Sequence, residues 1–381
     1  MIPAAALKVF LVSGYHTGSH RAWAEGYAAS SRHDIHLVAM PGAFWKWRLS
    51  GGFVSLAEQV EALAAGVGRP DVILATSMVD VAGLRGLVRW AGEVPVAVYM
   101  HENQITYPAT GRTRVEQGHG LATWTSLLAA DAVAFNSEFH RSTLLAALPR
   151  FLNSFPDESQ AHHLGAVEAR SVVLPVGCDL AHLASGPKVA PPLVLWNHRW
   201  DDDKHPEVFL DLMARLAATG AEFGVALAGE RFVDQRARRD DAVAALGDRV
   251  VLDGHLTRDE YEAVLAAASI VVSTAEQEFF GISIVEAMHA GAFPVLPRGL
   301  VYPERIPALL HRRCLYDSAA GAVGLLGAAL ADPAMRAATT AVLQGVTAAF
   351  DWRQVAPAYD AWLDAMTDGQ SGPTAEGRRR R

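Results

Sequence analysis

Two glutamates in the second half of the chain have the type and spacing of residues that bind sugars or nucleotides. Glu278 lies in a polar stretch after the apolar run 269–272, and Glu286 lies in the helical run that follows Gly281. A carboxylate accepts two hydrogen bonds, which suits the paired hydroxyls of a ribose or hexose. Free N–H groups at the start of a helix also attract anions. In the alternative interpretation, Glu278 only caps the helix and Glu286 lies on a solvated face.

Two cations flank an earlier strand-to-helix turn. Arg199 and Lys204 follow the apolar run 193–196, and Pro206 suits the first turn of a helix. Two positive side chains at such a turn are suited to binding a diphosphate, although both could be ordinary surface charges. The run DDD at 201–203 contains the DxD spacing of some metal sites. Its position between the two cations favours a turn and helix cap instead.

Polar residues also follow two apolar strands in the first half of the chain. The expected strand 8–12 leads into a turn that contains Gly18 and Ser19. The expected strand 94–100 is followed by four polar residues in a row, His101, Glu102, Asn103 and Gln104. Ligands bind at the carboxyl ends of strands in open α/β sheets, so both places are candidate binding sites. Alternatively, the glycine relieves a tight turn and the histidine is a buried hydrogen-bonding residue.

The stretch 45–48 interleaves aromatic and basic side chains in the order Trp45, Lys46, Trp47 and Arg48. Indole rings stack on bases or sugars, and the neighbouring cations can meet phosphates. This pattern therefore indicates a ligand surface. The alternative is a loop whose tryptophans pack on the core.

These residues are expected to be positioned by alternating strands and helices, the pattern of an α/β fold with parallel sheets. The proline-containing stretch 187–192 separates two groups of strands and is expected to link two domains. An amphipathic helix near the end of the chain is expected to pack back on the first domain. The expected boundaries are 1–186 for the first Rossmann-like domain, 187–348 for the second, 349–366 for the crossover helix and 367–381 for a disordered basic tail.

The composition is that of a globular chain with well-filled cores, since 51% of the 381 residues are hydrophobic and 19% are charged. A net charge of −8 argues against non-specific nucleic-acid binding through overall charge, but is compatible with a local basic patch. Cys178 and Cys314 are too few for a disulfide framework and are interpreted as buried thiols of a reduced, cytoplasmic protein. No apolar run reaches the roughly 20 residues that span a bilayer, and we expect no signal peptide.

The glycine turn, the Arg–Lys pair and the two glutamates together resemble the retaining GT-B glycosyltransferases, in which two Rossmann-like domains face a cleft. Longer stretches between Phe10 and Tyr316 are similar to the tRNA-queuosine α-mannosyltransferase family. They are GYHTGSH, WKWR, HENQITYP, FNSEFHRSTLL with LNSFPD, WNHRWDDDKHPEVF and STAEQEFFGISIVEAMHAGAFPVLPRGLVYPE. One departure lies in the first loop, where the family's GGSH is TGSH at 17–20.

The resemblance implies GDP-mannose as donor and the queuosine of a tRNA anticodon as acceptor, with retention and without a metal cofactor. It implies that the first domain is the acceptor side and the second binds the nucleotide sugar. By the same resemblance, Arg199 and Lys204 neutralise the diphosphate, Glu286 holds the ribose, and Glu278 and His101 contact the mannose. The further binding positions that it implies are Gly18, Ser19, Phe280, Gly281 and Ile282 for the donor and Glu102, Asn103 and Gln104 for the acceptor.

Two other functions fit the same residues. One is a GT-B glycosyltransferase with a lipid or small-molecule acceptor, although no amphipathic membrane helix is evident near the N-terminus. The other is a non-catalytic nucleotide-sugar binding protein, although the full set of charged residues is present. A tRNA partner requires a local basic patch, with Trp45 or Trp47 stacking on splayed bases. The candidate basic residues are Lys46, Arg48, Arg112, Arg114 and Arg141. The sequence makes no prediction of the oligomeric state.

Overall fold

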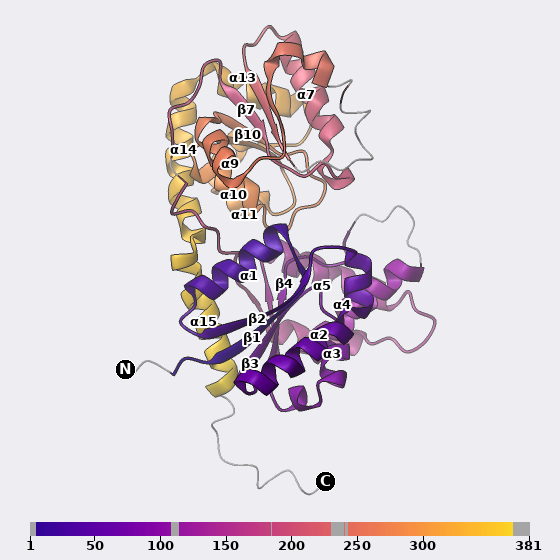
Figure 1. Ribbon diagram of the computed structural model, residues 1–381. Coiled ribbons are helices and arrows are strands. Elements are labelled where there is room, and N and C mark those ends of the chain that lie inside the picture. The colour runs from indigo at the N-terminus through magenta and orange to yellow at the C-terminus, as the bar shows by residue number, and fades with distance from the viewer. Residues whose placement is uncertain (1–4, 108–113, 184, 230–239, 241–242, 369–381) are drawn as a thin grey trace, which may run out of the picture. The chain divides into compact units, whose positions relative to one another are not determined.

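A computed structural model describes residues 5–107, 114–183, 185–229, 240 and 243–368 of the chain (Figure 1). The chain divides into two compact units, Met1–Gly177 with Trp352–Arg381, and Cys178–Asp351. The first boundary thus lies before the expected linker 187–192. The reason is that Cys178 already pairs with the end of the second unit. Its N–H donates to the Phe350 carbonyl at 2.7 Å, and it forms a parallel bridge with Asp351.

The first unit is a six-stranded sheet in the order β2-β1-β3-β4-β5-β6, in which all the pairings are parallel. The hydrophobic strands β3, β4 and β5 are completely buried, because helices cover both faces of the sheet. The elements of this unit are β1 (Lys8–His16), α1 (Gly18–Ser30), β2 (Asp34–Pro41), α2 (Trp45–Val67), β3 (Val72–Thr76), α3 (Val81–Leu87), η1 (Arg89–Gly92), β4 (Val96–Met100), α4 (Arg114–Ala129), β5 (Ala132–Phe135), α5 (Glu138–Leu152), η2 (Ala161–His163), α6 (Leu164–Ala169), β6 (Ser171–Val173) and α15 (Trp352–Asp368).

The C-terminal helix α15 packs against α1 of the first unit, as expected from its amphipathic pattern (Figure 1). Trp23 Nε1 donates to the Tyr359 hydroxyl at 3.1 Å, and the Tyr27 hydroxyl donates to Asp360 Oδ1 at 2.9 Å. This helix ends at Asp368, two residues into the expected tail 367–381. Residues 369–381, including the arginines of that tail, lie outside the described part of the chain.

The second unit has its own six-stranded sheet, in the order β12-β11-β10-β7-β8-β9, again with parallel pairings. In Figure 1, α7 lies beside α13, and α10 packs with α9 and α14. The elements of this unit are β7 (Leu193–Trp196), η3 (Asp202–Lys204), α7 (Pro206–Ala218), β8 (Gly224–Ala228), η5 (Gly247–Arg249), β9 (Val250–Gly254), α9 (Arg258–Ala267), β10 (Ile270–Val272), α10 (Ile282–His289), β11 (Phe293–Pro297), α11 (Tyr302–Arg305), η6 (Ala308–Leu310), α12 (His311–Cys314), β12 (Leu315–Tyr316), α13 (Ala319–Ala331), α14 (Pro333–Thr347) and η7 (Ala348–Phe350).

Both sheets confirm the predicted α/β class, and both cysteines are free and buried as expected. In the second sheet, β10 pairs directly with β7, with Ile270 opposite Val194. Because the two strands are parallel, the loops that follow them leave the sheet at the same edge. This pairing brings together the two motifs on which the sequence interpretation depends.

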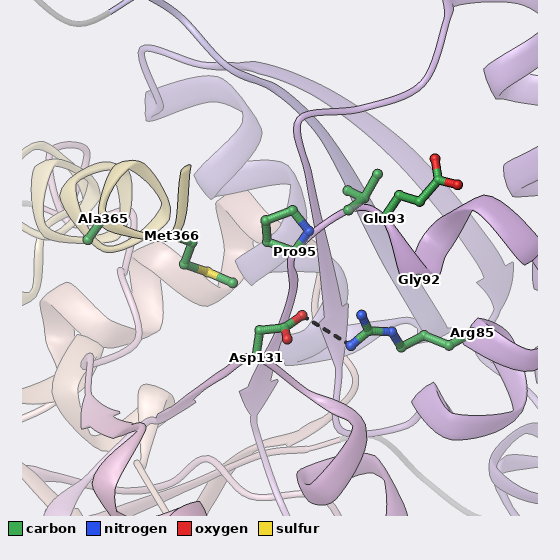
Figure 2. Close-up of a pocket in the computed structure, with 8 residues that line it drawn as sticks. Arg85, Gly92, Glu93, Pro95, Asp131, Ala365 and Met366 are labelled. Carbon is green, nitrogen blue, oxygen red and sulfur yellow. Dashed lines mark hydrogen bonds and ion pairs between the residues drawn. The ribbon is translucent and has the colours of Figure 1, made fainter. Parts of the chain in front are cut away.

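A pocket of about 360 Å³ lies in the first unit at the amino ends of β4 and β5, where these strands begin (Figure 2). An ion pair of 3.1 Å between Arg85 and Asp131 lies on its wall. Ligands of parallel α/β sheets bind at the carboxyl ends of the strands, so the position of this pocket does not match the candidate site. The lining residues are Arg85, Gly92, Glu93, Val94, Pro95, Asp131, Ala365 and Met366.

Candidate functional site

The centre of the site in the second unit is a buried ion pair between the loops that follow β7 and β10. Lys204 Nζ donates to the Gln277 carbonyl at 2.6 Å and lies 3.4 Å from Glu278 Oε2. Asp203 Oδ2 lies 3.2 Å from the same ammonium group. Lys204 and Glu278, which the family resemblance assigns to the diphosphate and the mannose of one donor, therefore lie side by side. The run 201–203 forms the predicted turn, in which the Lys204 N–H donates to the Asp201 carbonyl.

Each partner of this pair keeps the other charged. Burial alone would lower the pKa of Lys204, but the Glu278 and Asp203 carboxylates outweigh it and raise that pKa above its ordinary value. Burial alone would raise the pKa of Glu278, but the Lys204 ammonium and the N–H of Phe280 lower it overall. The site thus holds a fixed positive charge within a mostly buried, low-dielectric environment.

Glu278 also binds the backbone of the loop just before α10. Its Oε1 accepts from the Gly281 N–H at 3.0 Å and from the Phe280 N–H at 3.4 Å. Gly281 has a φ of 82°, in the left-handed region that favours glycine, and a Cβ there would lie 3.6 Å from Glu278 Cγ. Both N–H groups precede the helix, which begins at Ile282, so Glu278 fixes the loop before α10 and does not cap its first turn. The other carboxylate oxygen faces Lys204.

Glu286 is buried, with 7% of its surface exposed, so the interpretation that it lies on a solvated face is wrong. Its Oε1 accepts from Arg258 Nη1 at 2.9 Å, and its Oε2 accepts from the Tyr261 hydroxyl at 3.2 Å. Burial raises the pKa of Glu286 in spite of Arg258. Both partners come from α9, which packs on α10. Sequence reasoning missed Arg258 and Tyr261.

Arg199 and His198 follow β7 but have different surroundings. Arg199 is half exposed and pairs with Asp201 at 3.1 Å. His198 is buried, and burial, reinforced by Lys204, lowers its pKa to about 3. Within the described part of the chain, its Nε2 has no hydrogen-bond partner. His198 is therefore a neutral polar group beside the ion pair, and it was not among the predicted site residues.

The remaining donor positions of the second unit lie at the start of α10. Ile282 is the first residue of this helix, and Phe280, two residues earlier, has a buried side chain. Arg305 supports this segment, because its guanidinium lies 4.2 Å from the centre of the Phe280 ring and its Nε donates to the Phe280 carbonyl at 3.1 Å. The buried Phe280 side chain, in contact with Arg305, therefore helps to position the loop before α10.

In the first unit, His101 lies in an aromatic cluster at the carboxyl end of β4. Its ring centre is 4.4 Å from that of His20, 4.7 Å from Trp23 and 4.8 Å from Tyr99. Burial, together with His20 and His140, holds the pKa of His101 well below its ordinary value, so the ring is neutral. Its Nε2 has no hydrogen-bond partner among the described residues. A neutral imidazole with an unused nitrogen can pair with a sugar hydroxyl.

The three polar residues after His101 differ in their roles. Asn103 is buried, and its Oδ1 accepts from the N–H groups of Ile105 and Thr106 at 3.0 and 2.9 Å. This is a side-chain turn that fixes the backbone of the loop. Glu102 and Gln104 are half-buried in that loop. Asn103 thus has a local structural role in this loop.

Gly18 and Ser19 begin α1 at the carboxyl end of β1. Gly18 has a φ of 48° and both residues are exposed, while no described atom lies within 4 Å of a Cβ built on Gly18. The glycine therefore serves the backbone conformation of the turn and leaves space at the helix start. This agrees with both interpretations of the turn that the sequence allowed.

The aromatic and basic stretch 45–48 forms the first turn of α2 rather than a loop. Phe44, just before it, is 79% exposed and Trp47 is 65% exposed. Lys46 is exposed and its Nζ lies 5.5 Å from the centre of the Trp45 ring. In contrast, Arg48 is tied into its own loop, because its Nε donates to the Ala43 carbonyl at 3.2 Å.

The other predicted basic positions add little to this surface. Arg141 is paired with two glutamates, Glu138 at 3.2 Å and Glu168 at 3.4 Å. Arg112 lies outside the described residues, and the side chain of Arg114 also lies outside the described part. Within that part, the surface of Phe44, Lys46 and Trp47 is the strongest of the candidates for contact with bases.

Comparison with known proteins now identifies the family. Residues 8–178 match the model of the tRNA-queuosine α-mannosyltransferase N-terminal domain, and residues 182–307 match that of glycosyl transferases group 1. The tRNA-queuosine α-mannosyltransferase of Drosophila melanogaster is 30% identical over 78% of this chain and 81% of its own length. The chain belongs to the tRNA-queuosine α-mannosyltransferase family.

More distant proteins are also similar to this family member. The GDP-mannose:cellobiosyl-diphosphopolyprenol α-mannosyltransferase of Xanthomonas campestris is 25% identical over 76% of this chain and 75% of its own length. The solved sucrose-phosphate synthase of Thermosynechococcus elongatus aligns with a TM-score of 0.71 at 16% identity, and the match covers 95% of this chain and all of that one. The fold is GT-B, and the protein is a glycosyltransferase.

Among the described residues of this glycosyltransferase, no group of three or more His, Cys, Asp and Glu side chains is arranged to hold a metal ion. None of the helices in the described ranges has the length and apolar character needed to cross a membrane.

Proposed function

We propose that this protein transfers mannose from GDP-mannose to the queuosine of a tRNA anticodon, with retention of the anomeric configuration. The observation that carries the proposal is the buried Lys204–Glu278 pair at the start of α10, in a chain of this family. Two relatives support the choice of sugar. The Drosophila protein is named an α-mannosyltransferase of tRNA queuosine, and the Xanthomonas protein is named for GDP-mannose.

Departure of GDP places negative charge on the diphosphate, and the site holds the charge that stabilises it. Lys204 is fixed by three oxygen partners and needs no reorganisation as the bond breaks. Arg199, on the same turn, adds a second cation that can leave its exposed pair with Asp201. We propose that these two cations neutralise the diphosphate without a divalent ion.

Sugar recognition is assigned to carboxylates and neutral rings. Glu278 offers acceptor oxygens to mannose hydroxyls, and His198 beside it offers an unused ring nitrogen. Glu286 accepts hydrogen bonds from the ribose hydroxyls, which replace the hydrogen bonds that it accepts from Arg258 and Tyr261. His101, on the first unit, is assigned to a mannose hydroxyl because its buried ring is neutral.

The transfer step is proposed as a front-side attack on the anomeric carbon. The acceptor oxygen forms the new bond to that carbon as the bond to the phosphate oxygen breaks, and the acceptor proton passes to the departing phosphate. Attack and departure on one face retain the configuration. No side chain is required as a covalent nucleophile.

The acceptor surface is assigned to the start of α2. The exposed rings of Phe44 and Trp47 are suited to stacking on unpaired anticodon bases, and Lys46 adds positive charge beside them. Because Arg48 stabilises its own loop, we assign it no contact with RNA. This surface supplies the local basic and aromatic patch that an acidic protein needs for a tRNA partner.

The test is incubation of the full chain with radiolabelled GDP-mannose and tRNA from cells that either make or lack queuosine. Label on tRNA only when queuosine is present is the expected result, and analysis of the released nucleoside should show the α-anomer. Label in added polyprenyl phosphates or small glycosides, but not in tRNA, would assign another acceptor. Tight binding of GDP-mannose without transfer to any of them would indicate a non-catalytic binding protein.

A further inference from the structure

His205, next to the catalytic lysine, lies between two carboxylates from different segments. Its Nδ1 is 2.8 Å from Glu207 Oε1 in α7, and its Nε2 is 3.0 Å from Glu276 Oε2 in the loop after β10. A carboxylate accepts hydrogen bonds but does not donate them, so only the imidazolium form can donate to both partners. Because its φ is 47°, His205 also holds a left-handed backbone at the start of α7.

The segment that His205 holds through Glu276 is the loop that leads to Glu278. Other contacts join this loop to the turn of Lys204. The Glu276 N–H donates to the Asp203 carbonyl at 2.8 Å, and Thr274 Oγ1 donates to the Lys204 carbonyl at 2.7 Å. The His205 side chain is one-third exposed, at the outer side of this junction. It is therefore placed to reinforce the junction, and it is not among the residues assigned above to the sugar or the diphosphate.

We propose that His205 is a positioning residue whose protonated ring ties Glu276 to Glu207 and thereby fixes Glu278 against Lys204 for transfer. The inference rests on the proposed function for the roles of Lys204 and Glu278. Its physical basis is a pair of charge-assisted hydrogen bonds that join two loops of the same site. The tie makes sugar transfer dependent on the charge of one histidine.

The charges around His205 determine the direction of that dependence. Hydrogen bonds to Glu276 and Glu207 raise the pKa of His205 above its ordinary 6.5. Asp202, Asp203 and Lys204 are the charged residues of η3, next to His205 in the chain, and Lys204 keeps its charge because its own pKa is raised. As the pH rises through the raised pKa of His205, one ring nitrogen becomes an acceptor that faces a carboxylate, and the tie opens.

The first test follows the histidine itself and needs no substrate. NMR of the full chain with 15N-labelled histidine, assigned with His205→Asn, should show His205 titrating above 6.5. Asn is chosen because it tolerates a left-handed backbone. Glu276→Gln should move this titration to lower pH, and the backbone amides of the loop 273–281 should shift with the same midpoint. If His205 titrates at or below its ordinary pKa of 6.5 and the loop amides do not shift with pH, the tie is refuted.

The second test measures the rate of mannose transfer. His205→Asn should lower kcat about threefold to tenfold at neutral pH, with little change in the donor KM, the scale of one partly exposed charge-assisted contact. In the wild type, kcat should fall as the pH rises through the His205 titration, and in Glu276→Gln this fall should move to lower pH. The matched control is His36→Asn, which removes a histidine paired with Asp34 at 2.9 Å on β2 of the first unit.

The outcomes separate the two hypotheses. If no preparation transfers mannose to queuosine-containing tRNA, the proposed function fails, while the NMR titration still decides whether the tie exists. If transfer occurs but the pH profile of His205→Asn coincides with that of the wild type, the positioning role is overturned and the proposed function stands.

Discussion

Lys204 Nζ lies 3.4 Å from Glu278 Oε2, although the two residues are 74 positions apart in the sequence. They meet because β7 and β10 are neighbouring parallel strands whose following loops leave the sheet at one edge. The pair gives the glycosyltransferase a buried cation with a fixed position. In the proposed mechanism the chemical step depends on that charge, since the negative charge that it meets grows as the nucleotide leaves.

Replacing Lys204 with Met should therefore affect turnover more than binding. A preorganised charge at the position where transition-state charge develops is worth about 100-fold to 1000-fold in kcat, and we expect a loss of that size with a much smaller change in donor KM. Steady-state kinetics with GDP-mannose and queuosine-containing tRNA measure both constants. An increase in KM with kcat unchanged would contradict the assignment.

The control for this variant is Arg215→Ala, which removes an exposed cation of α7 that pairs with Asp211 one helical turn away. It changes the net charge of the second unit by the same amount without touching the site. Both kinetic constants should remain within about twofold of the wild type, because exposed pairs of this kind contribute little.

The proximity of Lys204 and Glu278 could be predicted from sequence because it depends only on strand order and direction. Each residue follows an apolar run that reads as a buried strand, and parallel α/β sheets gather such loops at one edge. The start of α10 was also predictable, since Gly281 separates the polar loop from a helical pattern. These features follow from local patterns and one rule of topology.

Other parts of the site depend on packing that periodicity does not encode. The pairing of Arg258 with Glu286 is set by how α9 and α10 pack on each other, so no local pattern indicated that Glu286 is buried. The helical start at Trp45 was missed because Phe44, with a φ of 53°, replaces the usual Ser, Thr, Asp or Asn cap. His205 looked like an ordinary residue before a proline, and only its two carboxylate partners reveal a role.

Arg258→Ala should destabilise the protein and weaken nucleotide binding. The change leaves the buried Glu286 carboxylate without its cation, which raises its pKa further and favours the protonated form, a poorer acceptor for ribose hydroxyls. Because Arg258 itself is half exposed, we expect a loss of about 1–3 kcal/mol in unfolding free energy, below the full cost of breaking a buried pair. Denaturant unfolding and calorimetric titration with GDP measure the two effects.

The double variant Arg258→Ala with Glu286→Gln is the matched comparison. It removes the uncompensated charge along with its partner, so stability should partly return while GDP binding stays weak. Stability losses that simply add in the double variant would mean that the two side chains act independently.

The protein should lose stability in acid when the carboxylate of Glu278 is protonated. Its native pKa lies below the ordinary 4.5, so the unfolded chain takes up the proton first as the pH falls. The stabilisation from its ionised form is fully present above 4.5 and is lost as the pH falls through the lower native pKa. Glu278→Gln should be less stable than the wild type by about 1–3 kcal/mol at neutral pH, with a difference that shrinks as the pH falls below the ordinary 4.5. Urea unfolding across this range measures it, and a difference independent of pH would contradict the ion pair.

Trp47→Ala should weaken the interaction with tRNA while leaving the donor site intact. Stacking of one base on an aromatic ring is worth about 1–3 kcal/mol, so the KM for tRNA should rise about fivefold to 100-fold. The donor KM should not change, because Trp47 lies on α2 of the first unit and the donor assignments are mostly in the second. Val54→Ala is the matched control, since Val54 is an exposed apolar residue on the same helix.

Lys46→Ala separates charge from stacking on this same surface. Removing one phosphate contact should lower the steepness of log affinity against log salt by about one. It should also weaken the binding of all tRNAs by a similar factor. Trp47→Ala should leave that slope unchanged, because stacking releases no counterions. Filter binding with queuosine-containing tRNA at several salt concentrations provides both slopes. If both variants bind as tightly as Val54→Ala at every salt concentration, the anticodon contacts another part of the protein, and the exposed rings of Phe44 and Trp47 require a different explanation.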